Sequence, residues 1–243
     1  MEEIHQGPKY GDSKPMRSIF RAIFFLFCAR PVLAGDAANL KVWGYSKDAK
    51  YIAFEQYGVH DGSAFPYSEI FIIDVAKNEY AGKPFKAVND AGEGEDDAGL
   101  KRIREKNFSD ASKAFQQLGI DTSYVPLHEL YSRLARNEMM PEDSLVLVKS
   151  ANPFDIKITS VEIENPVCPD IPPRLLDLQL IQNGRARSLQ KDTGLPPSRV
   201  CAFQYIIQAV FLKQNSLAVF IQFLSPGFEG PNARFICVTA KIN

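Results

Sequence analysis

The chain has 243 residues, of which 28 are Lys or Arg and 29 are Asp or Glu, giving a formal net charge of −1 at pH 7. This nearly neutral balance, without a basic cluster, excludes the usual electrostatic basis of nucleic-acid binding. Hydrophobic residues make up 45% of the chain, and the length is sufficient for one domain with a sizeable core. We therefore expect a single domain with no nucleic-acid partner.

The N-terminal region carries the pattern of a secretory signal peptide. Arg17 and Arg21 form a basic region, Ala22–Ala29 form a short apolar run, and Val32–Ala34 fits the small-residue cleavage pattern. The apolar run is shorter than the roughly 20 residues that span a bilayer. A buried N-terminal helix is the alternative interpretation. We predict a signal peptide over residues 1–34 and no membrane span after cleavage.

The same pattern predicts the domain organisation and the location of the protein. Cleavage after Ala34 leaves residues 35–243 as a single β-rich domain, which we expect to be periplasmic or secreted. The polar stretch Met1–Pro15 precedes the basic region. Met16 is therefore an alternative start of the chain.

The stretch Trp43–Asn78 predicts one β-hairpin with a long loop. Its sequence is WGYSKDAKYIAFEQYGVHDGSAFPYSEIFIIDVAKN. Tyr51–Tyr57 and Ile70–Val75 are rich in aromatic and β-branched residues, which favour strands. Ile70–Val75 is apolar on both faces, as expected for a strand that is buried on both sides. The residues between the two strands are rich in Gly, Ser and Pro, which favour a loop.

Within this hairpin, the string FEQYGVHDGSAFPYSEIFIIDV resembles the predicted secreted proteins called domain of unknown function 2259. The shorter pattern of a turn, YIAF, a long loop and IFIIDV resembles one blade of a TolB-like or WD40-like β-propeller. The chain departs from the family pattern at Ala49, His60 and Ala64, where the family carries Gly, Gln and Gly. The resemblance implies an extracytoplasmic protein. It brings no established reaction, so no catalytic residue is carried over.

The middle of the chain predicts a helical insert at about residues 98–139. Leu100–Leu118 places its apolar residues on one face and is followed by Gly119, a suitable C-terminal cap. Pro126–Met139 has apolar residues at i, i+3, i+4 and i+7 and begins with proline, which suits a first helical turn. We therefore predict a two-helix hairpin between β-segments. The acidic loop Asn89–Ala98 fails the EF-hand spacing, so we predict no metal site.

The remainder of the chain favours strands and contains a faint internal repeat. Phe211–Phe223 (FLKQNSLAVFIQF) echoes Tyr45–Tyr57 (YSKDAKYIAFEQY), so the same hairpin recurs near the C-terminus. Asn183-Gly184 marks a tight turn. The predicted fold class is mainly β (α+β), with antiparallel sheets, a repeated blade-like hairpin and a two-helix insertion. The expected strands outside the first hairpin are Pro84–Val88, Ser144–Lys149, Ile156–Ile163, Leu175–Ile181, Ala186–Gln190, Ala202–Leu212, Leu217–Leu224 and Ala233–Ala240.

The predicted mature domain contains three cysteines, Cys168, Cys201 and Cys237. An oxidising compartment permits one disulfide among them and leaves one free thiol. Our candidate pair is Cys168 with Cys201, and the sequence leaves all three pairings open. Three buried thiols without a disulfide are the alternative.

The loop of the first hairpin is the predicted binding surface. The candidate binding residues are Tyr57, His60, Asp61, Phe65 and Tyr67, since aromatic loops on a rigid sheet often form such surfaces. The alternative is that Phe65 and Tyr67 fold back and cap the hairpin core. His60 beside Asp61 would also permit acid–base chemistry, although neighbouring residues in a chain rarely face each other. We assign no catalytic residue.

Motifs of the common enzyme classes are missing from the sequence. It contains no H-E-x-x-H, C-x-x-C, G-x-S-x-G or P-loop motif, and we predict no cofactor. The favoured function is a non-enzymatic binding or structural module of the cell envelope, with an envelope protein or polymer as its partner. The alternative is a hydrolase that acts on an envelope polymer through paired carboxylates such as Glu55 and Asp61, which needs no histidine.

Export of the protein is the first testable outcome. Cells that express the full-length chain should contain a mature form beginning near Gly35, because the basic and apolar segments before it direct secretion and cleavage. Cell fractionation followed by N-terminal sequencing measures this. Ala34→Arg should block cleavage, since the cleavage site requires a small residue. A full-length product confined to the cytoplasm would contradict the signal-peptide prediction.

Overall fold

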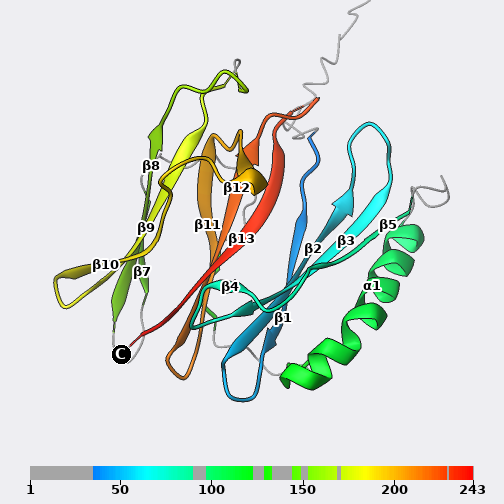
Figure 1. Ribbon diagram of the computed structural model, residues 1–243, viewed down its shortest axis with the longest axis horizontal. Coiled ribbons are helices and arrows are strands. Elements are labelled where there is room, and N and C mark those ends of the chain that lie inside the picture. Colours follow the sequence, from blue (N-terminus) through cyan, green and yellow to red (C-terminus); the bar gives the residue numbers. More distant parts are fainter. Residues whose placement is uncertain are drawn as a thin grey trace, which may run out of the picture. The chain divides into compact units, whose positions relative to one another are not determined.

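The computed structural model describes residues 35–89, 97–122, 129–132, 144–148, 153–168, 171–228 and 230–242, all within the unit Leu33–Asn243 (Figure 1). Residues 129–132 and 144–148 are described by their backbone alone. The predicted signal peptide lies outside the described residues. Three antiparallel sheets and one α-helix make up the described part of the chain. The prediction of a mainly β protein with antiparallel sheets is therefore confirmed.

The first sheet contains the hairpin predicted in the stretch from Trp43 to Asn78. Strand β2 (Tyr51–Val59) pairs with β3 (Pro66–Asp74) along its whole length, which confirms the two predicted strands and the loop between them. Strand β1 (Asn39–Tyr45) pairs with the other edge of β2 and was not predicted. The short strands β4 (Glu79–Tyr80) and β5 (Phe85–Val88) both pair with β3.

Two four-stranded sheets follow in the second half of the chain. The central sheet has the order β13 (Asn232–Lys241), β12 (Ser216–Ser225), β11 (Gln204–Lys213), β6 (Glu129–Ser132). The third sheet has the order β10 (Arg185–Lys191), β9 (Arg174–Gln182), β8 (Phe154–Glu162), β7 (Ser144–Val148). The seven strands predicted over this part of the sequence are all present. Asn183 (φ 52°) and Gly184 (φ 73°) form the predicted turn between β9 and β10, because a two-residue hairpin turn requires positive φ at both positions.

The central sheet is covered on both faces. One hydrophobic core joins Ile207, Val219 and Ile221 of this sheet to residues of β8 and β9, such as Ile156 and Leu178. A second core joins the alternate residues of the same strands to the first sheet, and its members include Phe54, Phe71, Phe211 and Phe220. Successive side chains of a strand point to opposite faces. Strand β12 therefore reads as a nearly continuous apolar run, in which every residue except Ser225 is buried.

The internal repeat corresponds to two hairpins in facing sheets. Tyr45–Tyr57 covers the turn between β1 and β2, and Phe211–Phe223 covers the turn between β11 and β12. Each hairpin is followed by a third antiparallel strand, β3 or β13. The buried hydroxyl of Tyr45 links the two copies, lying 3.2 Å from the Phe211 carbonyl oxygen and 3.0 Å from that of Ser216. Burial raises the pKa of Tyr45 well above its ordinary value, so this hydroxyl remains a donor.

Helix α1 (Asp97–Leu118) covers the outer face of the first sheet, beside β3 and β5 (Figure 1). Its residues Ala111 and Phe115 pack against Ala53, Ile70 and Ile72 in a third core. The helix ends as predicted at a glycine: Gly119 has φ 67°, and the Ile120 amide donates to the Phe115 carbonyl at 2.9 Å. This is the hydrogen-bond pattern of a Schellman cap. The prediction of a helix over Leu100–Leu118 is thus confirmed.

The second predicted helix, Pro126–Met139, is wrong. Its central residues Glu129–Ser132 form strand β6, which pairs antiparallel with β11. The apolar spacing in this segment covers barely two helical turns, a length at which helices gain little stability on their own. Pairing with the otherwise free edge of β11 satisfies the backbone groups of both strands. The other residues of the predicted helix lie outside the described part of the chain. Within the described part, α1 is the one α-helix.

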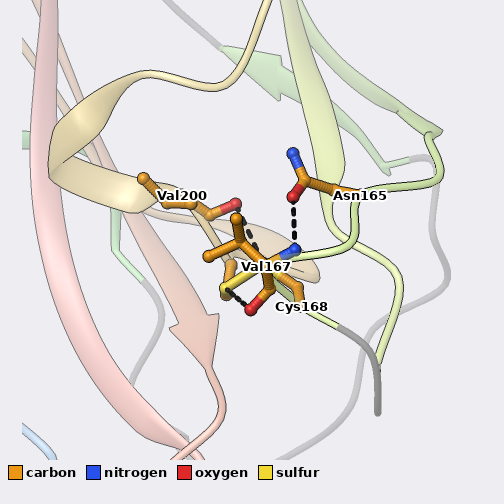
Figure 2. Close-up of a disulfide and its surroundings, with 5 residues drawn as sticks. Asn165, Val167, Cys168 and Val200 are labelled. Atoms are coloured by element: carbon orange, nitrogen blue, oxygen red, sulfur yellow. Dashed lines mark hydrogen bonds between the residues drawn. A yellow bond between two sulfur atoms is a disulfide. The ribbon is translucent and has the colours of Figure 1, made fainter.

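A disulfide joins Cys168 to Cys201 in the structure, with the sulfur atoms 2.02 Å apart. Figure 2 shows that the loop carrying Cys168 is shaped by Asn165, whose side-chain oxygen accepts from the Val167 amide at 2.8 Å. The carbonyl oxygen of Val200 lies 3.6 Å from the Cys168 sulfur. The bridge thereby connects the loop after β8 to the segment after the 3₁₀ turn η1 (Pro197–Arg199). Cys237 keeps a free thiol, and burial raises its pKa.

Truncation of Phe220 tests the double-sided core. Phe220 is fully buried, and its ring contacts Phe54 and Phe211 edge-on, at centroid distances of 5.3 and 5.7 Å. Phe220→Ala should lower the free energy of unfolding by about 3–5 kcal/mol, since it leaves a cavity. Phe228, which is 92% exposed, is the matched control, and Phe228→Ala should change it by less than about 0.5 kcal/mol. Urea denaturation measures both; equal effects would contradict this packing.

Candidate functional site

The five predicted binding residues lie in or beside the β2–β3 loop, and the first sheet separates them. Tyr57 lies opposite Ser68 in the ladder, on the face covered by α1, where the Arg104 guanidinium carbon is 3.5 Å from the Tyr57 ring centroid. Tyr67 lies opposite Gly58, and the Arg234 guanidinium of β13 packs against its ring. The alternation of side chains along a strand therefore divides the predicted cluster into two sites.

The loop itself is closed by its own backbone. The His60 amide donates to the Phe65 carbonyl at 2.9 Å, and the Ala64 amide donates to the His60 carbonyl at 2.9 Å. Phe65 is half-buried beside them. Within the described residues, the buried Oδ2 atom of Asp61 has no hydrogen-bond partner. The loop is thus compact, and the structure does not bring the Asp61 carboxylate to His60 through any described hydrogen bond.

The inner face of the hairpin carries a group that we call the Asp36 cluster: Asp36, His60, Tyr67 and Arg234. Asp36 is 7% exposed, and its carboxylate receives three side chains. His60 Nδ1 lies 2.8 Å from Oδ2, the Tyr67 hydroxyl donates to Oδ1 at 3.1 Å, and the Arg234 guanidinium forms an ion pair with Oδ2. Arg234 also donates to the Asp36 backbone carbonyl at 2.7 Å.

Backbone contacts hold Asp36 in this position. The Asp36 amide donates to the Asn232 side chain at 3.0 Å, and its carbonyl accepts from the Ala233 amide at 3.0 Å. The Ala38 amide donates a hydrogen bond to the Ala233 carbonyl, also at 3.0 Å. The segment before β1 is therefore fastened to the start of β13. Asp36 and Arg234 escaped the sequence prediction because 198 residues separate them, and neither belongs to a motif.

Contacts within the Asp36 cluster orient His60 and Tyr67. The rings of His60 and Tyr67 stack at a centroid distance of 4.3 Å. Burial, together with the neighbouring Asp36 charge, raises the pKa of Tyr67, which remains a neutral donor. A carboxylate that binds Nδ1 orients an imidazole and leaves Nε2 for another partner. The His60 side chain is 37% exposed, so its free edge can meet solvent or a ligand.

The outer face of the hairpin holds a second buried carboxylate, Glu55. Its side chain is fully buried, and Arg104 of α1 binds both of its oxygens, at 2.9 and 3.0 Å. Ser68 donates to the same carboxylate at 3.0 Å, and Asn107 donates to the Ser68 hydroxyl at 2.8 Å. Glu55 therefore ties the helix to the sheet. A bidentate, buried carboxylate of this kind is poorly suited to general acid–base work.

A buried serine–lysine pair is also structural. Lys241 Nζ lies 2.6 Å from Ser216 Oγ, which is the spacing of an activated nucleophile. Ser216 is fully buried, however, and its hydroxyl donates to the Ala49 carbonyl at 2.5 Å. Within the described ranges, His, Cys, Asp and Glu side chains do not gather in any group of three that could hold a metal ion.

Together these features define an antiparallel β protein built on a doubly covered sheet, with the buried carboxylates Asp36 and Glu55 bound by internal partners. The family model of the predicted secreted protein with domain of unknown function 2259 matches residues 53–241, and the chain belongs to this family. The predicted resemblance is thus confirmed, and the family description agrees with a periplasmic or secreted location. No curated protein and no solved structure matches the chain. No helix in the described ranges is long and apolar enough to cross a membrane.

Removal of the Asp36 carboxylate tests whether the cluster is a structural joint. Asp36→Ala should lower the free energy of unfolding by about 3 kcal/mol, because it leaves the Arg234 charge and the Tyr67 hydroxyl without their partner. Asp110→Ala, which breaks the exposed pair with Lys106 on α1, is the control and should change it by less than about 0.5 kcal/mol. Guanidinium denaturation with the disulfide intact measures both. Equal stability of the two variants would refute the joint.

Proposed function

We propose that the protein is a non-enzymatic binding module of the cell envelope and that the β2–β3 loop, residues 60–65, is its contact surface. The observation that carries the proposal is the fixed geometry of this loop. Its backbone is closed between His60 and Phe65, and His60 is held by Asp36 and by stacking on Tyr67. A preorganised surface loses little conformational entropy on association, which favours binding.

The chemical character of the loop supports a binding role. Gly62 and Ser63 are exposed, and His60, Asp61 and Phe65 are partly exposed. Such a mixture of an aromatic ring with hydrogen-bonding groups is common in contact surfaces. Val59, at the end of β2, is 36% exposed and extends the apolar part of this surface. A partner that offers both apolar and hydrogen-bonding groups, such as an envelope protein or polymer, is complementary to it.

The state of the carboxylates favours binding over hydrolysis. The alternative function, hydrolysis of an envelope polymer through Glu55 and Asp61, requires two carboxylates that face one cleft. Glu55 is fully buried and bound by Arg104, whereas Asp61 belongs to the loop at the far end of β2. Asp36 is also occupied, by His60, Tyr67 and Arg234. The binding module needs no rearrangement of these contacts.

A charge placed on the loop tests the proposed function. Ser63→Arg should reduce the capture of an envelope component by the immobilised mature protein at least tenfold, because the added side chain obstructs the contact surface. Ser188→Arg, on an exposed position of β10, is the matched control and should capture as much as the wild type. Equal capture by the two variants would show that the loop is not part of the contact surface. Release of soluble fragments from envelope polymer would favour the hydrolase.

A further inference from the structure

A cavity of about 210 Å³ opens between helix α1 and the first sheet. We call it the helix pocket. Lys41, Trp43 and Glu55 line it from strands β1 and β2, and Lys101, Arg104, Glu105 and Phe108 line it from α1. Trp43 stacks on Phe108 at a centroid distance of 4.6 Å. This pocket lies on the opposite face of the sheet from the Asp36 cluster, so it is separate from the proposed contact surface.

The charges of the helix pocket do not balance. Arg104 and Glu55 neutralise each other through two hydrogen bonds. Lys41 lies opposite Glu55 in the β1–β2 ladder, yet within the described residues no hydrogen bond or ion pair joins it to an acid. Its ammonium nitrogen instead lies 3.5 Å from the centroid of the Trp43 ring. Lys101 and Glu105, which also line the pocket, form an exposed ion pair at 3.8 Å. The pocket lining therefore carries one positive charge, that of Lys41, in excess of its acids.

The environment of Lys41 makes that charge costly. Burial lowers the pKa of Lys41, the nearby Arg104 charge lowers it further, and the attraction of Glu55 opposes them without cancelling them. A partly desolvated cation is stabilised by an anion in contact with it, and the interaction is stronger than the same contact in bulk water. Among the described residues, the ammonium group of Lys41 thus has no negative partner in direct contact.

A second donor, at the wall of the helix pocket, also lacks a partner. The indole Nε1 of Trp43 is buried and has no hydrogen-bond acceptor among the described residues. A buried polar group of this kind is uncommon, since an unsatisfied donor carries a free-energy cost. An indole N–H can only donate, and an ammonium group can only donate. Both unpaired groups are therefore donors. The indole Nε1 is closed to solvent, so the ammonium group of Lys41 is the donor that an oxygen-rich acceptor in the cavity would complement.

We propose that the helix pocket binds an oxyanion, the carboxylate or phosphate group of a small ligand. Lys41 supplies the charge, and the ring of Trp43, against which the Lys41 ammonium group packs, forms the wall beside it. Arg104 remains bound to Glu55 and fixes the pocket wall. The volume is below the roughly 300 Å³ at which pockets hold drug-sized ligands, so the occupant is a single acidic unit, such as one sugar acid or a phosphate.

The single tryptophan of the chain is a built-in reporter. Sodium glucuronate and inorganic phosphate are titrated separately into the mature protein at constant ionic strength, with sodium chloride as the reference. At least one of the two should produce a saturable change in Trp43 fluorescence that chloride does not, and the one that does identifies the carboxylate or the phosphate arm. The absence of a saturable change with both probes would overturn the proposal.

Two variants distinguish binding in the helix pocket from a general effect of salt on surface charges and from a loss of folded protein. Lys41→Gln should weaken the fluorescence response at least tenfold, because it removes the charge-assisted contact. Lys157→Gln, at an exposed position of β8, should leave the response unchanged. The binding probe should raise the melting temperature of the wild type and not that of Lys41→Gln, whose own melting temperature should be no lower than the wild type's. An unaltered response in Lys41→Gln would refute the site.

Discussion

Burial of the central sheet on both faces is the constraint on which the rest of the structure depends. Strand β12 is apolar along nearly its whole length, so a sheet built on it cannot leave either face in water. The first sheet covers one face and the third sheet covers the other. The first sheet then has an outer face of its own, where Ala53, Ile70 and Ile72 require the cover that α1 provides. Each layer therefore covers an apolar face that the layer beneath it exposes.

Buried carboxylates act as joints between these layers. Glu55 ties the helix to the first sheet, and Asp36 ties the segment before β1 to β13. Each carboxylate is surrounded by donors, as buried charges must be. Both carboxylates are therefore occupied by internal partners, and other groups remain accessible: the free edge of His60 on one side of the sheet and the ammonium group of Lys41 on the other. The contacts of the buried carboxylates thus influence which polar groups remain accessible to a ligand or partner.

The local sequence pattern predicted most of the strands. The features that it did not predict depend on contacts between residues far apart in the chain. The hairpin of β2 and β3, the Asn183-Gly184 turn and helix α1 were predictable because their signals lie in neighbouring residues. Residues 129–132 carried a helical spacing, and the unpaired edge of β11 made them a strand. The candidate site was predictable as a loop. Its division into two sites was not, because it depends on the register between β2 and β3, which places Tyr57 and Tyr67 on opposite faces. Their partners Arg104 and Arg234 come from distant segments of the chain.

The attachment of Asp36 to β13 constrains the order in which the protein can be assembled. Asp36 is held by Ala233 and Arg234. Both residues belong to β13, which follows all the other described strands in the sequence. A chain that is still being synthesised lacks them, so its N-terminal segment has nothing to bind. Closing a contact across 198 residues also makes this step late, since its loop entropy is offset only when the intervening sheets have formed. The joint at Asp36 consequently closes after the local hairpins, so the segment before β1 gains its place in the fold only when β13 is present.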